Sequence, residues 1–363
     1  MKGKTMNRKM ILNYLNEYNE HEQFYMNYHE AAKSPDTLKA FLDSVDKDYV
    51  LSQHILVFDL FPDQVPEEWS DDLFFDKNDS KSILVRKHYR YTPAFNHLNV
   101  FFEMKYVLRG TCSMTIGNDS ITLSKGDLCM LSPATMHSVS VFDDSMVINI
   151  LIRHSTLEDI LFNVLRDQSI ISAFFLDNIY AKKHLEYMIF HTNDDCDIRN
   201  LVLDMYVEEI RKDFYSSSIL NSMLIILFAQ LTRNHRKTVD FSPTVKKLPL
   251  GNTNLLSYIQ NHYQGVTLSD VAREFSYDTA YCSRLIKSIT GQSFSNLLRD
   301  IRLKRAEIML QSTNMPISQI SRTIGYENPE AFIRAFRKRT DMTPSQYRNK
   351  GNVEHQEPAP AEY

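Results

Sequence analysis

Residues 251–350 contain the same pattern twice, fifty residues apart, and this repeat constrains the fold more than any other feature of the chain. In each copy a short helix of apolar periodicity is followed by a brief break. A second helix then begins at a capping residue, Asp278 in the first copy and Asn328 in the second. Aligning the two caps also aligns Arg284 with Arg334. Helix, tight turn and helix with a basic outer face is typical of the helix-turn-helix, whose second helix enters the major groove of DNA.

One such pattern alone would fit an ordinary helical hairpin, but two in register favour DNA binding. The charge of the chain supports this interpretation. Residues 251–350 hold 14 basic and 8 acidic residues, although the whole chain has 41 Lys and Arg against 45 Asp and Glu. Since DNA is a polyanion, we expect the basic segment to meet it. A predicted helix over 294–311 would span about 27 Å and set the two second helices about one turn of DNA apart.

The pattern upstream of the basic segment changes twice. Residues 1–80 are predicted to form a helical segment, and residues 81–155 carry short β-branched and aromatic runs separated by turn residues. Such runs predict a sandwich or a barrel. Residues 156–235 become helical again and end in an apolar helix that must be buried, either in the core or at a subunit interface. Residues 236–250 predict a linker, and residues 351–363 predict a disordered tail.

A group of polar residues in the β-rich stretch is a candidate site. His97, Asn99 and Glu103 share the same parity, so on one strand their side chains would point to one face, and His137 follows in a later run. Asn is a poor ligand for first-row metals, so a metal site is weakly supported and we expect no metal and no cofactor. A small-molecule pocket is favoured over a satisfied polar patch. The expected pocket residues are Arg86, His88, His97, Asn99, Glu103, Tyr106 and His137.

Composition excludes several other classes of protein. The 363-residue chain is ordinary in composition for a globular protein, with 43% hydrophobic and 24% charged residues. Its four cysteines lie far apart, which argues against a disulfide framework and a zinc finger. The most apolar run, over 219–231, is shorter than the roughly 20 residues that cross a bilayer, and the first residues contain no signal-peptide core. We therefore expect a cytoplasmic protein without a membrane partner.

The basic segment resembles the DNA-binding domain of the AraC/XylS family of transcription regulators. The runs TGQSF, RLKRAEIML, IGYENPEAFIRAFRK and DMTPSQYR carry the resemblance. It implies double-stranded DNA as the partner. Arg284 and Arg334 could each pair with a guanine, whereas Glu330 could accept only from a base amine. The positions implied to face bases are Ala280, Ser283, Arg284, Glu330, Ile333 and Arg334, and those suited to phosphates are Lys287, Arg337, Lys338 and Arg339.

The β-rich stretch is similar to the cupin barrel. AraC-type regulators commonly carry a degenerate cupin that binds an effector. The resemblance therefore implies a cupin-like effector-binding barrel over 81–155 and a helical dimerisation region over 156–235. The spacings that match the two cupin motifs are His97-x-Asn99-x3-Glu103-x6-Gly110, with Asn99 where His is usual, and Gly126-x6-Pro133-x3-His137.

The sequence thus predicts a multidomain α+β protein, with an N-terminal cupin-like β-barrel and flanking helices followed by an all-α domain that holds two helix-turn-helix units. We expect a homodimeric transcription activator, controlled by a small-molecule effector and working with RNA polymerase, and not an enzyme. The donors and acceptors of the pocket suit a sugar or a sugar acid. Two alternatives remain. One is a metal-dependent cupin enzyme fused to a DNA-binding domain, against which Asn99 argues, and the other is an effector-independent DNA-binding dimer.

Overall fold

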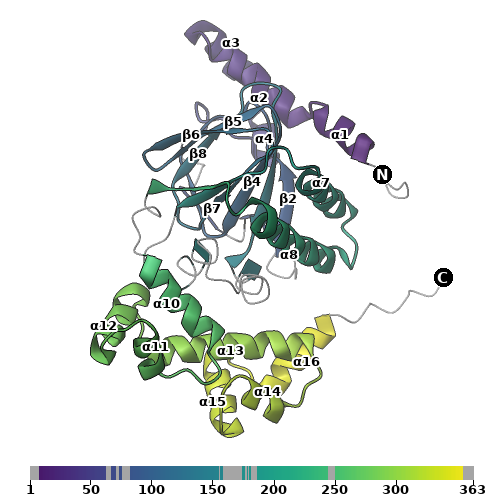
Figure 1. The fold of residues 1–363 in the computed structure, drawn as a ribbon. Helices are drawn as coiled ribbons and strands as arrows, with labels where there is room; N and C mark the ends of the chain where they lie inside the picture. The colour runs from purple at the N-terminus through teal and green to yellow at the C-terminus, as the bar shows by residue number, and fades with distance from the viewer. Residues whose placement is uncertain are drawn as a thin grey trace, which may run out of the picture. The chain divides into compact units, whose positions relative to one another are not determined.

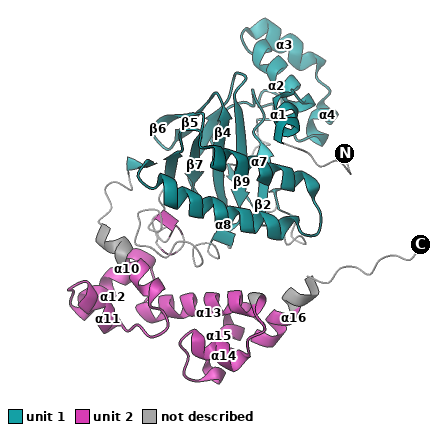
Figure 2. Ribbon diagram, turned by 45° about the vertical axis from the view of Figure 1, so that its right-hand side comes forward, with its two compact units in different colours: residues 1–157, 184–247 teal, residues 158–183, 248–363 magenta. Residues whose placement is uncertain are grey.

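The computed structural model describes residues 8–62, 67–70, 73–75, 82–154, 156–157, 174–175, 178, 180, 186–243 and 250–354. The chain forms two compact units (Figure 2), one of residues 1–157 with 184–247 and the other of residues 158–183 with 248–363. The first unit combines sheets and helices, and the described part of the second is helical. The predicted combination of a sheet-rich N-terminal part and a helical C-terminal part is confirmed. Within the described ranges, no helix combines the length and apolar character that a bilayer crossing requires.

The first unit is built on antiparallel strands (Figure 1). A six-stranded sheet has the order β11-β10-β7-β4-β9-β2, and a three-stranded sheet has the order β6-β5-β8. A short parallel pair joins β1 and β3. The strands are β1 (Glu68–Trp69), β2 (Ile83–Lys87), β3 (Leu98–Asn99), β4 (Phe102–Arg109), β5 (Thr111–Ile116), β6 (Asp119–Ser124), β7 (Asp127–Leu131), β8 (His137–Ser140), β9 (Met146–Ile152), β10 (Tyr187–His191) and β11 (Val239–Phe241).

The two larger sheets share one apolar core. Cys129 and Leu131 of β7 pack in the same buried cluster as Met114 and Ile116 of β5. Exposed and buried positions alternate along β5, as expected for a strand with one face on a core and one in water. β4 is buried at almost every position because helices cover the other face of its sheet. The polar residues of the candidate site therefore lie at the edge of an apolar interior.

The described strands do not close into the single barrel that the sequence predicted. The six-stranded and three-stranded sheets are separate ladders. An isolated bridge between His97 and His137 leads from the smaller sheet to the β3 segment. β6 pairs with β5 along one side, so it is an edge strand in the described structure, and half of its residues are exposed. Strand spacing allowed either a sandwich or a barrel, because it does not determine whether the edges of the sheets pair.

Two helices cover the outer face of the six-stranded sheet. They are α7 (Cys196–Arg211) and α8 (Ser216–His235), and both lie across this face in Figure 2. On α8, Leu220, Leu224, Leu227 and Leu231 follow helical spacing and are fully buried. The predicted burial of this apolar helix is therefore confirmed on one of its faces. Its other face leaves Ile219 and Ile226 exposed.

Before β1, the described residues form four helices, although the predicted helical segment 1–80 also contains β1 itself. They are α1 (Arg8–Asn16), α2 (Glu20–Ala31), α3 (Pro35–Ser44) and α4 (Lys47–Ser52). A buried ion cluster holds α2 against the segment that follows β2. Glu22 of α2 is completely buried and accepts from Lys87 at 2.6 Å and from Arg90 at 2.8 Å. Since a buried carboxylate needs such partners, this cluster fixes the position of α2 on the sheet.

The sequence placed some boundaries differently from the structure. The stretch 156–235 was predicted to be helical, but it contains β10, and the predicted linker 236–250 contains β11. Both strands complete the six-stranded sheet of the first unit. Short apolar runs do not reveal by periodicity alone whether they form a helix or a strand, which explains the error. Most of the predicted tail lies outside the described residues, which end with α16 at Glu354.

The second unit contains the repeat that the sequence predicted. The helices after α10 (Leu250–Asn261) form two pairs, and a long helix, α13 (Phe294–Ser312), joins the pairs. The first pair is α11 (Leu268–Glu274) and α12 (Thr279–Thr290), and the second is α14 (Ile317–Thr323) and α15 (Pro329–Thr340). α16 (Pro344–Glu354) follows and packs on α13.

Candidate nucleic-acid interface and effector cavity

The two predicted recognition helices, α12 and α15, begin with equivalent caps. Asp278 accepts hydrogen bonds from the backbone N–H of Ala280 and Tyr281, at 2.8 and 3.1 Å. Asn328 accepts from the backbone N–H of Glu330 at 2.8 Å. These caps satisfy backbone donors that a helix start otherwise leaves without partners. The capping residues therefore act as the sequence predicted.

The two recognition helices also end in the same way. Gly291 after α12 and Asp341 after α15 both adopt the left-handed conformation. In the last turn, Thr290 donates to the carbonyl of Ile286 at 2.8 Å, and Thr340 donates in the same way within α15 at 3.0 Å. The starts and the ends of α12 and α15 therefore have the same local geometry fifty residues apart. The repeat in the sequence is thus also a repeat in the structure.

The turns between the paired helices differ by one residue. The first turn has Ser276 at a φ of 55°, and the second has Gly325 at a φ of 90°. These two residues are 49 positions apart, whereas the caps that follow them are 50 apart. Gly325 is required here, because a Cβ atom would lie 2.0 Å from the carbonyl oxygen of Gln264. The second turn therefore depends on this glycine.

The structure exposes four of the six residues predicted to read bases. Ala280 and Arg284 are exposed on α12, and Glu330 and Arg334 are exposed on α15. Arg334 lies 3.8 Å from Glu330 across one helical turn, and both side chains are more than two-thirds exposed. Such an exposed pair is weak, so Arg334 remains available for another partner. The remaining two, Ser283 and Ile333, are half-buried, and Ile333 packs against the apolar core of the second pair.

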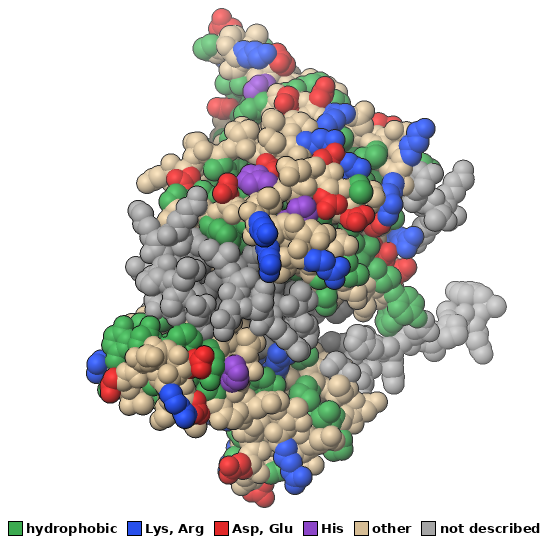
Figure 3. Space-filling model, viewed as in Figure 1, with side chains coloured by type: hydrophobic (Ala, Val, Ile, Leu, Met, Phe, Trp, Pro, Cys, Tyr) green, Lys and Arg blue, Asp and Glu red, His purple; other side chains and the backbone are tan. Residues whose placement is uncertain are grey.

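The four residues predicted to contact phosphates differ in the contacts that they make within the protein. Lys287, Arg337 and Lys338 are exposed on the recognition helices. Arg339 is exposed as well, but it also lies 3.0 Å from Glu307 and 3.5 Å from Asp300, both on α13. These ion pairs connect Arg339 to α13 and set it apart from the other three. Basic side chains reach the surface of the second unit beside acidic ones in the view of Figure 3.

The first unit holds a cavity of about 1200 Å³ at the edge of its core. Its lining comes from the sheets, from the helices α1, α2 and α4, and from the end of α7. The lining includes five of the seven predicted pocket residues and, among the residues that the prediction missed, a lysine. They are Arg86, His88, His97, Asn99 and Glu103, together with Lys105.

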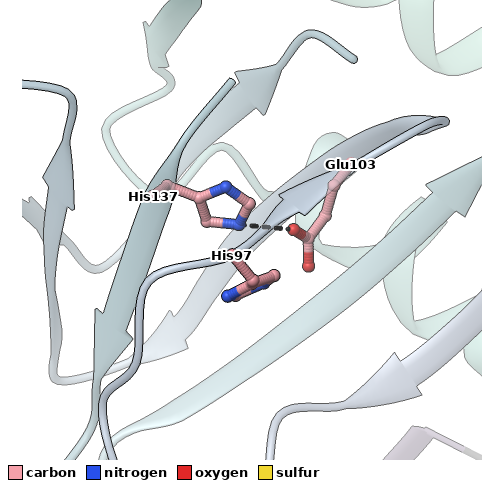
Figure 4. A group of neighbouring side chains, drawn as sticks. All are labelled: His97, Glu103 and His137. Atoms are coloured by element: carbon pink, nitrogen blue, oxygen red, sulfur yellow. Dashed lines mark hydrogen bonds and ion pairs between the residues drawn. The ribbon is translucent and has the colours of Figure 1, made fainter. Parts of the chain in front are cut away.

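Glu103 organises the polar floor of this cavity (Figure 4). Its Oε1 accepts from Lys105 Nζ at 2.5 Å. Its Oε2 accepts from His137 Nε2 and from Asn99 Nδ2, each at 3.1 Å. Burial alone would raise the pKa of Glu103, but the charge of Lys105 and the hydrogen bond from His137 outweigh burial and lower this pKa well below its usual range. Glu103 is therefore an ionised internal counterion with three donors around it.

Two of the histidines that line the cavity, His88 and His97, are neutral. Burial lowers the pKa of His97 to about 4 and that of His88 to about 3. His97 Nδ1 lies 3.2 Å from the carbonyl of Phe95, which leaves its Nε2 for another partner. Among the described residues, three buried polar atoms at the cavity have no hydrogen-bond partner: His88 Nε2, Asn99 Oδ1 and Trp69 Nε1. They offer a bound molecule both donors and acceptors.

Aromatic rings form one wall of the cavity. Trp69 and Phe95 lie 4.8 and 4.6 Å from the ring of His97, measured between centroids. Phe74 packs edge-on against Phe101 at 5.3 Å. The guanidinium group of Arg86 lies over the ring of Phe74 at 5.7 Å. The cavity thus combines an apolar wall with a polar floor, which is typical of small-molecule sites.

Two predicted pocket residues do not line the cavity. Tyr106 lies on β4 with the opposite parity to Glu103, so its side chain points to the other face of the sheet. His137 is buried behind Glu103 and holds the carboxylate. Lys105 was missed although it stands two residues after Glu103 and therefore shares its face. Strand parity could have found it, but lysine is rarely buried, and the predicted set did not include it.

The residues present fit a metal ion poorly. Nitrogen and oxygen atoms of His97, Glu103 and His137 lie within 4.8 Å of one another. However, the ammonium group of Lys105 already lies against the Glu103 carboxylate, and the side chain of Asn99 donates to the same carboxylate. A divalent cation would meet a buried positive charge and a weak amide ligand. We therefore derive no metal-dependent step for this site.

A variant that replaces Lys105 by Met is expected to lose about 3–5 kcal/mol of folding stability at neutral pH, because it leaves the Glu103 charge buried without its partner. In the wild type the pKa of Glu103 is lowered, so its contribution is present above the unfolded pKa and is lost as pH falls through the folded pKa. In the variant, burial dominates and raises this pKa. The difference in folding stability between the variant and the wild type should therefore become smaller as pH falls. Denaturant unfolding at several pH values measures this.

The double variant Lys105→Met/Glu103→Gln is the control, because it removes both charges and should recover most of the lost stability. A Lys105→Met variant as stable as the wild type at neutral pH would contradict the assignment of Lys105 as the counterion of Glu103.

Comparisons with known proteins agree with the repeat and its exposed helices. A model described as a helix-turn-helix domain matches residues 271–350. The regulatory protein SoxS of Escherichia coli (strain K12) is 33% identical over 98 residues, which cover 27% of this chain and 92% of SoxS. The HTH-type transcriptional activator RhaR of Escherichia coli O139:H28 is 25% identical over 287 residues, which cover 77% of this chain and 95% of RhaR.

Among solved structures, the C-terminal domain of AraT, a response regulator from Geobacillus stearothermophilus, is 32% identical. The match covers 32% of this chain and 95% of that domain, with a TM-score of 0.28. The match to SoxS extends over nearly all of SoxS at one-third identity, and the domain model falls on the repeated helix pairs. The chain therefore belongs to the AraC/XylS family of DNA-binding transcription regulators.

Proposed function

We propose that this regulator is a homodimeric transcription activator whose DNA binding is controlled by a small molecule held in the cavity of the first unit. The observation that carries the proposal is the polar floor around Glu103, which adjoins an aromatic wall and three polar atoms without partners. Buried donors and acceptors without hydrogen-bond partners cost folding stability. Their presence at this cavity therefore favours a site that binds a molecule over one that is only part of the core. The protein is a regulator in this account and not an enzyme.

Recognition of DNA would use both exposed recognition helices. Arg284 and Arg334 are proposed to pair with guanine edges, and Ala280 and Glu330 would contribute to base choice beside them. Ser283 and Ile333 are half-buried, so they would contact only bases that lie close to the surface of the helix. Lys287, Arg337 and Lys338 would contact phosphates, giving affinity and salt dependence without sequence information.

A sugar or a sugar acid is the proposed class of effector. Hydroxyl groups both donate and accept, so they suit the free Asn99 oxygen and the Trp69 N–H together. An aromatic wall beside such polar groups suits the apolar face of a sugar ring. Arg86 is exposed at the cavity and would meet the carboxylate of a sugar acid.

Signal transfer is proposed to pass through α7. Tyr206 and Glu209 of this helix line the cavity, and Glu209 also accepts a hydrogen bond from the backbone of Val85. α7 packs on α8, whose exposed Ile219 and Ile226 would form the dimer contact. For this control, the effector must bind one arrangement of these helices more tightly than another. Equal affinity for both arrangements would leave the equilibrium between them unchanged. The active dimer would then engage RNA polymerase.

Titration of the full chain with sugars and sugar acids tests the effector proposal. Trp69 is the single tryptophan of the chain and lies at the cavity, so its fluorescence should change on binding. At 100 times Kd, the effector should add about 2.7 kcal/mol of stability and also change the affinity for DNA. Arg86→Gln should weaken the binding of a sugar acid and leave a neutral sugar unaffected.

Tyr106→Phe is the matched control, because this side chain lies on the opposite face of β4 and should not affect binding. Turnover of the ligand would favour the enzyme alternative. No response to any ligand, with constitutive DNA binding, would favour the effector-independent dimer and contradict the proposed control.

A further inference from the structure

Recognition helix α12 presents an exposed aromatic ring that the set of predicted base readers does not include. Tyr281 is the third residue of α12 and is 46% exposed. Ala280 precedes it, and Arg284 lies one helical turn further along the exposed side. The N-terminal residues of a recognition helix are the ones that contact base edges. Tyr281 is therefore in the right part of the helix to do so.

Other aromatic rings hold the Tyr281 ring in place. It packs edge-on against Tyr277 with centroids 5.1 Å apart. Tyr277 in turn stacks on Phe275 at 6.2 Å, and Phe275 contacts Tyr258 of α10 at 5.8 Å. The ring thus stands at the end of a row of half-buried aromatic side chains that begins on α10. A side chain fixed in this way loses little conformational entropy when it binds.

The second helix pair has no counterpart of this ring. The equivalent position on α15 is Ala331, which is half-buried. The aromatic residues of α15, Phe332 and Phe336, contact each other at 5.6 Å and are completely buried. The two pairs therefore present different surfaces, and an apolar contact at this position is available to the first pair alone.

We propose that Tyr281 reads a base, with its ring packed against the C5 methyl group of a thymine next to the guanine that Arg284 reads. The inference rests on the proposed recognition of DNA by α12. In the major groove, thymine alone presents a methyl group. An apolar side chain that contacts this methyl group can therefore distinguish thymine from the other bases. Ala280 offers a single methyl group, whereas Tyr281 offers a whole ring that is exposed on the helix surface.

A methyl-deletion scan tests the proposal with the full chain. The wild type first selects its preferred duplex from a random library, and each thymine of that duplex is then replaced by uracil, which lacks only the methyl group. One replacement should weaken wild-type binding roughly fourfold, as expected for one buried methyl. Tyr281→Ala should bind the thymine duplex more weakly and should not respond to that replacement.

Two further variants separate the ring from other effects. Tyr281→Phe keeps the ring and should respond to uracil as the wild type does, whereas a loss equal to that of Tyr281→Ala would assign the contact to the hydroxyl and overturn the inference. Ser288→Ala, an exposed change further along α12, should have no effect. If no thymine depends on Tyr281 while Arg284→Ala still changes guanine preference, this inference is wrong and the proposed function stands. If the wild type selects no sequence, either with or without sugars and sugar acids present, both are wrong.

Discussion

A full-length variant with both Arg284 and Arg334 replaced by Ala is expected to lose most of its sequence preference while it keeps most of its affinity for unrelated DNA. Each arginine that pairs with a guanine contributes about 1–3 kcal/mol of discrimination, so the pair should account for a preference of about 30-fold or more. Both guanidinium groups are exposed on the recognition helices, so the fold should not depend on them.

The affinity for unrelated DNA should depend on salt almost as in the wild type. Lys287, Arg337 and Lys338 remain in place, and phosphate contacts produce the slope of affinity against salt. Titrating the selected duplex and an unrelated duplex at several salt concentrations measures both properties.

The repeat itself supplies the control. Arg273 of α11 and Arg322 of α14 are also exposed and are 49 positions apart, at matching places on the first helices of the two pairs. The Arg273→Ala/Arg322→Ala variant loses the same charge but should keep its sequence preference. Equal loss of preference in both double variants would show that net charge, and not base reading, explains the effect.

Replacing Gly325 by Ala is expected to destabilise the second unit by about 2–5 kcal/mol. The φ of 90° costs a non-glycine residue about 1–2 kcal/mol, and forcing an extra carbon into a packed site costs about 1–3 kcal/mol more. The added carbon would lie 2.0 Å from the Gln264 carbonyl oxygen, which also accepts from Arg302 at 2.9 Å. The carbonyl cannot move away without losing that hydrogen bond.

Gly265→Ala is the matched control for this change. Gly265 lies 60 residues earlier in the same unit, and a Cβ atom there meets nothing within 4 Å. Thermal unfolding of the full chain should show a transition at lower temperature for Gly325→Ala only, with weaker DNA binding near that temperature. Equal stability of the two variants would contradict the tight contact of the second turn with Gln264.

The helix-turn-helix repeat could be predicted because its signals are local. Asp278 and Asn328 cap the helices that follow them directly, and the apolar spacing of each helix lies within a few residues. Such features depend on neighbouring residues and not on distant contacts. The one-residue difference between the two turns was not predicted, because it becomes visible only when Ser276 and Gly325 are seen in the same conformation.

The sheet-rich unit was predicted less completely because its contacts join distant segments. β10 and β11 come from stretches that were predicted as helix and linker, and they pair with β7 and with each other. The parity argument treated His97, Asn99 and Glu103 as one strand, but β3 ends at Asn99 and β4 begins at Phe102. Glu103 still meets Asn99 through a hydrogen bond between their side chains.

Selection from a random duplex library by the full chain tests the central claim most directly. The account predicts enrichment of one duplex with two guanine-containing elements about one turn of DNA apart, since α13 separates the two recognition helices by a fixed length. The Arg284→Ala/Arg334→Ala variant should enrich no such pair. Enrichment of the same duplex by the wild type and this variant, or of none by the wild type both with and without sugars and sugar acids, would contradict the account.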